Sequence, residues 1–339
     1  MEWRACRQGW RPTCMSIIRS LLLAPVLVGH SWIYGTDLQK SDSPSGVQIA
    51  VAVDRGNMHI VRALLNSAKL NSPTAFVHVI HAQDGGPACQ DLVRQDFGRV
   101  ARCVLWEEEK IAHVSSLIRV VSGQNSSACE GLEGCDSLRA KRLANSFNFA
   151  RFFLADILPD LDYVFWMDCD VVIRNSINSI WTQSIQSSAL VSAFPEPVRF
   201  GRFYLQENSL MQLMNEQFDG LNMSMDADSF NDGVIFINLK QWRQRSVRKD
   251  LLWLMTQHSR SETGLWKYGT QPIMMLLGSV HGWSRLKPEH CYGDLGFRTA
   301  EPKRTDEAVF LHFNGELKPW KTGGINKELW EPYYYHREI

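Results

Sequence analysis

The stretch YVFWMDCDVV at residues 163–172 constrains the fold of this chain more than any other. Five apolar or aromatic residues precede an Asp-Cys-Asp triplet, and two valines follow it. An apolar run without polar alternation is typical of a strand that is covered on both faces, as in a parallel sheet. We therefore predict an α/β fold in which this strand carries Asp168 and Asp170 at its end.

The two carboxylates of this stretch indicate a metal site. In extended backbone, residues i and i+2 project to the same side, so Asp168 and Asp170 are expected to point together while Cys169 faces away. Neighbouring carboxylates repel each other unless a cation lies between them, and carboxylate oxygens suit Mg²⁺ or Mn²⁺, which also bind substrate phosphates. A bare D-x-D triplet is a weak signal, and a solvated acidic turn is the alternative.

Composition indicates a folded protein without an excess of either charge. The chain of 339 residues is long enough for one large α/β domain, or for one domain with additions. Its 36 basic residues match its 36 acidic residues, which argues against nucleic acid or acidic lipid as a partner. A hydrophobic content of 45% and 12 tryptophans are typical of a globular chain.

The first 36 residues resemble a signal-anchor or signal peptide. Four arginines precede a short apolar run at residues 21–28, and no clear A-x-A cleavage site follows, which favours an uncleaved anchor. The run is short for a bilayer span of about 20 residues. Residues 37–46 have the composition of a linker, so we expect the folded domain to occupy residues 47–339. Sequons at Asn125 and Asn222 agree with a lumenal location.

The eight cysteines form no CxxC pair and no zinc-ligand spacing. Cys129 and Cys135 bracket a loop rich in Glu and Gly and are candidates for a local disulfide in an oxidising compartment. Cys89 and Cys103 are a second candidate pair.

The remaining chain alternates strand and helix patterns, which predicts right-handed crossovers and a mostly parallel sheet. Expected strands are Val47–Val53, Ala75–Ala82, Arg102–Trp106, Ala189–Phe194 and Gly233–Leu239, and expected helices are Asn57–Lys69, 144–158 and Gln241–His258. Residues 107–142 are expected to be an insertion or mobile loop, and 195–230 a long variable stretch. Thr270 is expected to cap a short helix that has Pro272 in its first turn.

Ligands of open α/β sheets bind at the carboxyl ends of the strands. Asp54 follows the first expected strand, and Asp168 and Asp170 follow a later one, so we expect all three at the same edge of the sheet.

Five motifs, in this order, resemble retaining glycosyltransferase family 8, which has a GT-A fold and uses nucleotide-sugar donors. They are NFARFFL at 148–154, MDCDVV at 167–172, FNDGV at 230–234, INLKQWR at 237–243 and HFNGELKPW at 312–320. The resemblance covers the chain from Val47 to its C-terminus. The segments at 265–270 and 329–333 are similar to eukaryotic members, the galacturonosyltransferase-like and glycosyltransferase-8-domain-containing proteins.

The resemblance implies a metal site and a donor site. It implies that Asp168, Asp170 and His312 hold Mn²⁺ (or Mg²⁺) against the diphosphate of UDP, with Asp168 also at the donor. It implies that Lys318 and Gly315 bind the phosphates. It further places Arg151 at the donor, and Asp54 at the uracil or ribose.

The resemblance assigns the catalytic positions to Asn231 and Asp232, in a sugar-binding turn, and to Gln271, on the reactive face of the sugar. Many bacterial members carry Asp-Gln-Asp where this chain has Thr-Gln-Pro at 270–272, which weakens any transfer of their galactosyl specificity. Beyond the metal pair no carboxylate pair is evident, although Glu196 and Asp232 are stray candidates. We therefore expect front-face transfer, in which the leaving phosphate oxygen accepts the proton of the acceptor and Gln271 stabilises the sugar without attacking it.

The resulting expectation is a retaining enzyme of the Golgi or ER lumen that moves a hexosyl or uronosyl group from a UDP-sugar to a glycan or glycoprotein. One alternative is an inactive nucleotide-sugar- or glycan-binding homologue in the secretory pathway. Aspartate-nucleophile phosphatases also begin with a strand and D-x-D, but Val171, Val172 and the HFNGELKPW segment fit them poorly.

Overall fold

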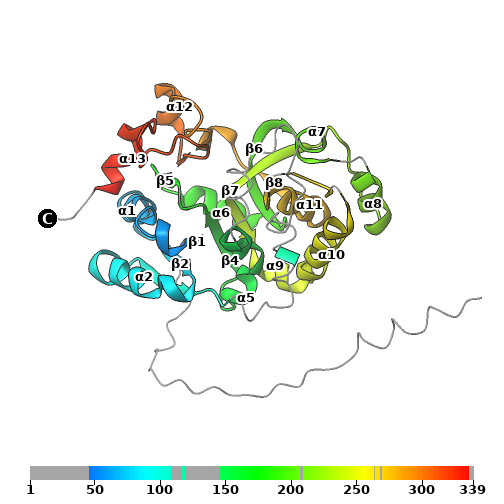
Figure 1. The fold of residues 1–339 in the computed structure, drawn as a ribbon, viewed down its shortest axis with the longest axis horizontal. Coiled ribbons are helices and arrows are strands. Elements are labelled where there is room, and N and C mark those ends of the chain that lie inside the picture. The colour runs from blue at the N-terminus through cyan, green and yellow to red at the C-terminus, as the bar shows by residue number, and fades with distance from the viewer. Residues whose placement is uncertain are drawn as a thin grey trace, which may run out of the picture. The chain divides into compact units, whose positions relative to one another are not determined.

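A computed structural model describes residues 46–107, 117–118, 146–206, 209–262, 264–267 and 269–335. Every described residue belongs to one unit, which lies within Asp42–Ile339 (Figure 1). The expected signal-anchor, the linker up to residue 45 and most of the 107–142 insertion lie outside the described residues.

The core of this unit is a seven-stranded mixed sheet. In spatial order its strands are β3 (Ala101–Leu105), β2 (Phe76–His81), β1 (Gln48–Ala52), β4 (Tyr163–Met167), β7 (Asp228–Asn238), β6 (Val191–Arg199) and β8 (Trp283–Arg285). The first four strands are parallel, β7 is antiparallel to both of its neighbours, and β8 is parallel to β6. The predicted mostly parallel α/β sheet is therefore confirmed.

Helices cover both faces of the sheet, which explains the unbroken apolar runs in its strands. Successive residues of β4 face opposite sides: Trp166 joins one core cluster, whereas Phe165 and Met167 join the other. The Phe165 side is covered by α1 (Val61–Asn71), α2 (Gly86–Leu92) and α6 (Asn178–Gln186). The Trp166 side is covered by α5 (Leu154–Ile157), α9 (Leu239–Gln244), α10 (Val247–Arg260) and α11 (Gln271–His281).

A second sheet, not expected from the sequence, brings the C-terminal segment to the D-x-D triplet. Its strands are β5 (Val171–Ile173), β10 (Phe310–His312) and β9 (Cys291–Tyr292). β10 runs antiparallel to β5, and His312 is paired with Val171. Figure 1 shows α12 (Pro302–Glu307) and α13 (Lys327–Tyr334) on the same side of the unit as α1, and Asn66 of α1 donates a hydrogen bond to the carbonyl of Tyr333 (2.7 Å).

The prediction of one strand through residues 163–172 was wrong. β4 ends at Met167, residues 168–170 form a turn in which Val171 N donates to Asp168 O (3.2 Å), and β5 then leaves the central sheet. The physical reason is that β5 pairs with β10, about 140 residues further along the chain, rather than with the strands beside β4. The turn still leaves Asp168 and Asp170 near each other, although not through extended backbone.

Two predicted helices are also interrupted. The 144–158 segment is a 3₁₀ helix over Ser146–Phe153 followed by α5, and the Gln241–His258 segment is divided into α9 and α10. The division falls at Ser246, whose φ of 54° lies in the left-handed region and cannot continue a helix. The expected variable stretch contains the end of β6, α7 (Phe200–Tyr204) and α8 (Ser209–Gln217).

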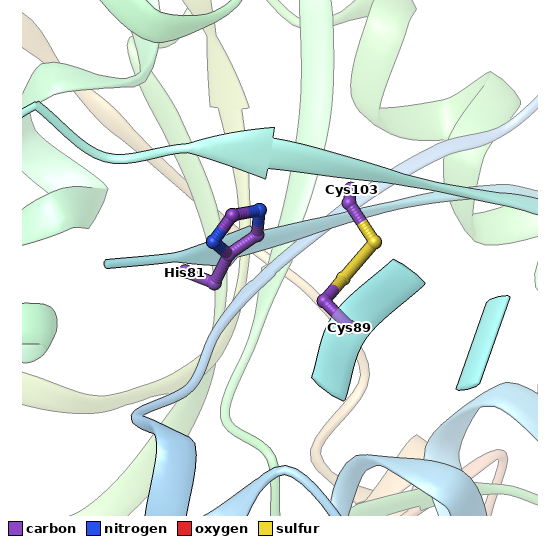
Figure 2. A group of neighbouring side chains, drawn as sticks. All are labelled: His81, Cys89 and Cys103. Atoms are coloured by element: carbon purple, nitrogen blue, oxygen red, sulfur yellow. A yellow bond between two sulfur atoms is a disulfide. The ribbon is translucent and has the colours of Figure 1, made fainter. Parts of the chain in front are cut away.

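The candidate disulfide between Cys89 and Cys103 is confirmed. It joins α2 to β3, with the two Cα atoms 6.0 Å apart (Figure 2). His81, at the end of β2, lies close to the two sulfur atoms, but sulfurs that are bonded to each other offer no thiolate to a metal. The other candidate pair, Cys129 and Cys135, lies outside the described residues.

In the part of the chain that the structure describes, every helix is too short or too polar to cross a bilayer.

Candidate active site

The site lies where β4 ends and β10 passes beside it. His312 Nε2, at the end of β10, is 3.2 Å from Asp170 Oδ1 and 3.8 Å from Asp168 Oδ2. Ligand atoms of these three residues all lie within 4.8 Å of one another. Asp170 and His312 are buried, whereas the Asp168 side chain is 30% exposed, so the cluster reaches solvent on the Asp168 side. The convergence expected of these residues is present in the fold.

The two oxygens of each carboxylate have different neighbours. Asp168 Oδ1 accepts hydrogen bonds from Arg151 Nη2 (3.0 Å) and Trp166 Nε1 (2.9 Å), while its Oδ2 is the atom nearest His312. Asp170 Oδ2 accepts from Lys318 Nζ, while its Oδ1 lies nearest His312. One oxygen of each carboxylate is therefore anchored by a neighbour, and the other points into the cluster.

Neighbouring charges shift the pKa values of Asp170 and His312 in opposite directions. Burial opposes a charge on Asp170, but the positive charges of Lys318 and His312 outweigh it and hold the pKa of Asp170 far below its ordinary value. Burial also opposes a charge on His312, but Asp170 and Asp168 outweigh it and raise the pKa of His312. The Lys318 ammonium, the Arg151 guanidinium and the His312 imidazole thus all lie against the two carboxylates.

Gly233 on β7 leaves the space that His312 occupies. A Cβ built on Gly233 would lie 2.2 Å from His312 Cε1 and 2.8 Å from Nε2.

Two carboxylate oxygens and an imidazole nitrogen, oriented by anchored neighbours, form a donor set that suits Mn²⁺ or Mg²⁺. The residues present therefore fit a divalent ion.

Lys318 and Gly315 lie in the turn that follows β10. Lys318 Nζ contacts the carbonyl of Phe313 (2.8 Å) as well as Asp170. Gly315 has a φ of 125°, and a Cβ there would lie 2.4 Å from the carbonyl carbon of Gly296. Glycine is therefore required at 315 by its backbone conformation and by the close approach of Gly296.

The Arg151 side chain is buried, with 2% of it exposed. Its guanidinium lies over the Trp166 ring (4.7 Å) and pairs with Asp168 (3.0 Å) and with Asp232 Oδ2 (2.6 Å). It also donates to the backbone carbonyls of Asp232 (2.7 Å) and Asn148 (2.9 Å). In this structure Arg151 holds the two acidic side chains of neighbouring strands in fixed positions.

Asn231 and Asp232 lie within β7 and not in a turn, so that detail of the prediction was wrong; β7 begins earlier because it pairs with the extended β6. Asp232 Oδ2 also accepts from Thr270 Oγ1 (3.0 Å). Thr270 occupies the position before α11, but its hydroxyl binds Asp232 and does not cap the helix, which corrects the predicted cap. Burial raises the pKa of Asp232 even though Arg151 opposes it.

Gln271 is the first residue of α11 and lies beside Asn231, whose Nδ2 is 3.5 Å from Gln271 Oε1. Its Nε2 contacts Glu196 Oε1 (2.8 Å), the Phe230 carbonyl (2.9 Å) and the Tyr204 hydroxyl. The sequence indicates Glu196 only as a stray carboxylate and carries no signal for Tyr204. No sequence pattern connects these residues, because Gln271 lies 75 and 67 positions away from them.

Asp54 follows β1 at the same edge of the sheet. It stands at the start of the short 3₁₀ helix Arg55–Asn57, where it accepts hydrogen bonds from the backbone (2.9 Å) and side chain of Asn57. Burial, and then the charges of Asp170 and Asp168, raise the pKa of the Cys169 thiol, with a smaller contribution from Asp54.

The fold is that of GT-A glycosyltransferases, as comparison with solved structures shows. The crystal structure of galactosyltransferase LgtC in complex with donor and acceptor sugar analogs matches 85% of this chain and 95% of its own, with a TM-score of 0.57 and 18% identity. The WbbM bifunctional glycosyltransferase matches 86% of this chain and 50% of its own, with a TM-score of 0.57 and 15% identity.

Sequence comparison then identifies the family. Residues 97–323 match the model of glycosyl transferase family 8, and the chain belongs to this family. Glycosyltransferase 8 domain-containing protein 1 of Xenopus laevis is 27% identical, over 55% of each chain. Probable galacturonosyltransferase 10 of Arabidopsis thaliana is 28% identical over 58% of this chain and 35% of its own. The chain thus spans about half, or less, of the length of these curated relatives.

Proposed function

We propose that this protein is a metal-dependent retaining glycosyltransferase that moves a hexosyl or uronosyl group from a UDP-sugar to a glycan or glycoprotein acceptor. The observation that carries the proposal is the convergence of Asp168, Asp170 and His312, each carboxylate anchored through its second oxygen. Relatives whose names describe probable galacturonosyltransferases and a galactosyltransferase support the reaction class.

Asp168, Asp170 and His312 would hold Mn²⁺ or Mg²⁺, which would supply Lewis-acid stabilisation of the charge that develops on a leaving diphosphate. Lys318 lies against Asp170 and brings a second positive charge to the same place. A fixed cation of this kind stabilises developing phosphate charge without reorganisation. Gly315 would allow the phosphates to approach the backbone, and Asp54 and Arg151 would act at the nucleoside side of the donor.

The described residues contain no carboxylate placed as a free nucleophile beside Gln271. Asp232 is buried and paired with Arg151, and Glu196 accepts hydrogen bonds from Tyr204 and Gln271. These contacts support front-face transfer: the acceptor hydroxyl bonds to the anomeric carbon, the bond to the diphosphate breaks, and a leaving phosphate oxygen accepts the hydroxyl proton. Gln271 would stabilise the oxocarbenium-like sugar through its carbonyl oxygen, with Asn231 and Asp232 beside it.

The test measures UDP release from a panel of UDP-sugars in the presence of Mn²⁺. The UDP-sugar from which UDP is released is then tested for transfer of its sugar to acceptors. We expect release from at least one donor, loss of release with EDTA, and loss of at least about 10²-fold in Asp170→Asn. Asp250→Asn is the matched control, because Asp250 forms a similar carboxylate–histidine pair with His281 (2.8 Å) in the helical layer. Absence of release from every UDP-sugar would contradict the proposal and favour an inactive binding homologue.

We also propose that residues 1–36 direct the protein into the ER or Golgi lumen as a type II membrane protein. The Cys89–Cys103 disulfide supports an oxidising compartment, and Asn222 of the second sequon is exposed. Alkaline extraction of membranes from cells that express the full chain should leave an anchored protein in the pellet. Recovery of an unglycosylated, fully reduced protein from the cytosol would contradict this localisation.

A further inference from the structure

A polar cluster behind Gln271 joins three segments that are distant in sequence. Glu196 comes from β6, Tyr204 from α7 and Gln271 from the start of α11. The Tyr204 hydroxyl donates to Glu196 Oε1 (2.6 Å), and Gln271 Nε2 lies within hydrogen-bond distance of both. Tyr204 is buried, and its ring stacks on Phe200, so its hydroxyl has a fixed position.

Counting hydrogens fixes the orientation of the Gln271 amide. Nε2 carries two hydrogens, and three acceptors surround it: Glu196 Oε1, the Phe230 carbonyl and the Tyr204 oxygen, which has already given its own hydrogen to Glu196. If the amide were flipped, its oxygen would face a carboxylate and a carbonyl, neither of which can donate. The NH₂ group therefore points to this cluster, and Oε1 points to the Asn231 side.

We propose that Glu196 and Tyr204 are positioning residues that hold the carbonyl oxygen of Gln271 toward the donor sugar. This inference rests on the proposed function, in which a positive charge develops at the anomeric carbon during transfer. The carbonyl end of an amide stabilises such a charge, whereas the NH₂ end opposes it. Glu196 and Tyr204 would then act on the reaction only through Gln271, without touching substrate.

The experiment is a double-mutant cycle on turnover of the UDP-sugar that the wild type hydrolyses. Glu196→Ala and Tyr204→Phe should each lower kcat by roughly 10-fold or more, because a misplaced group loses much of its contribution, with little change in the KM for the donor. Glu196→Gln should recover part of the loss, because its oxygen can still accept. In the Gln271→Ala background, Glu196→Ala should cost less than about 2-fold further, since residues that act through one group are not additive.

Two matched controls and one spectroscopic readout separate positioning from general support of the fold. Glu216→Ala removes an exposed carboxylate that accepts from Gln212 (2.7 Å), and Tyr163→Phe removes a hydroxyl at the far end of β4; both should keep wild-type kcat. The side-chain amide resonance of Gln271, in protein labelled at glutamine, should shift in Glu196→Ala and Tyr204→Phe and stay unchanged in both controls.

The outcomes distinguish this inference from the proposed function. A wild type without turnover on any UDP-sugar overturns both. An active wild type in which Glu196→Ala costs the same factor with and without Gln271, or in which the Gln271 amide resonance does not move, overturns the positioning role alone. Non-additive losses in kcat together with the shifted resonance establish it.

Discussion

At the residue scale, the site depends on carboxylate groups that each contact more than one neighbouring side chain. Lys318 illustrates this, because its ammonium is a fixed cation at a carboxylate that also faces His312. We expect Lys318→Ala to lower kcat by roughly 10²–10³, as for other preorganised electrostatic groups, with the loss measured at saturating donor and Mn²⁺. Lys321→Ala, three residues further on and exposed, is the control and should keep full activity. Equal kcat values for Lys318→Ala and Lys321→Ala would show that Lys318 does not stabilise the developing phosphate charge.

Gly233 makes a second prediction at this scale. In Gly233→Ala the added methyl would overlap His312 and displace its imidazole from the carboxylates. We expect the free energy of unfolding to fall by about 1–3 kcal/mol, as in other overpacked sites, and Mn²⁺-dependent turnover to fall with it. Gly98→Ala should be nearly neutral, because the nearest atom to its new Cβ is 3.7 Å away. Chemical denaturation and UDP release measure the two effects, and an unchanged Gly233→Ala protein would contradict the tight packing.

At the scale of elements, the Cys89–Cys103 disulfide ties α2 to the edge strand β3. Replacing both cysteines by alanine should lower the free energy of unfolding by about 2–4 kcal/mol, mainly because the unfolded chain is no longer cross-linked. Cys291→Ala, which removes a half-buried free thiol, should have a smaller effect. Urea unfolding of the three proteins is the measurement, and equal midpoints for the wild type and the double variant would show that the bridge does not form.

The sequence predicted elements best where local pattern decides them. The apolar run at β4 and the alternation of strands and helices gave the parallel part of the sheet, because burial on both faces leaves a visible signature. The turn at 168–170 and the second sheet were missed, because β5 is defined by pairing with β10, a contact between distant segments. Ser246 has a left-handed backbone conformation, but a serine in the sequence does not signal the end of a helix, as a glycine or asparagine would.

The candidate site shows the same limits. The D-x-D pattern itself predicts Asp168 and Asp170 as metal ligands, the motif resemblance adds His312 and Lys318, and the fold brings all four together. The burial of Arg151, and its pairing with Asp232, follow from tertiary packing that one sequence does not display. The sequence marks Glu196 only as a stray carboxylate and gives no signal for Tyr204, because the contacts of both with Gln271 exist only in the folded protein.

At the scale of the whole molecule, buried neutral histidines predict that stability falls in mild acid. His78 is 1% exposed; its Nδ1 accepts from Arg102 (2.8 Å), and its Nε2 lies 2.9 Å from Gln48 Oε1. Burial, with the charge of Arg102, lowers the pKa of His78 from 6.5 to about 3. The unfolded chain therefore binds this proton first, and the stabilisation present above pH 6.5 is lost as the pH falls toward 3.

We expect this histidine to contribute up to about 1.4 kcal/mol per pH unit to the slope of unfolding free energy against pH. Denaturant unfolding between pH 4.5 and 6 measures the slope, and His78→Asn should reduce it. His59→Asn, which removes an exposed imidazole, should keep the wild-type slope. A slope that is the same in all three proteins would contradict a neutral His78 in the folded state.

We propose above all that one divalent cation is held jointly by the D-x-D turn at residues 168–170 and by His312 at the end of β10. Titration of Mn²⁺ into the full-length protein with UDP, followed by the electron paramagnetic resonance of free Mn²⁺, tests it without reference to turnover. We predict one Mn²⁺ per chain in the wild type and in Asp250→Asn, and binding weakened at least about 10-fold in both Asp170→Asn and His312→Ala. Mn²⁺ binding that is unchanged in His312→Ala or Asp170→Asn would contradict the account.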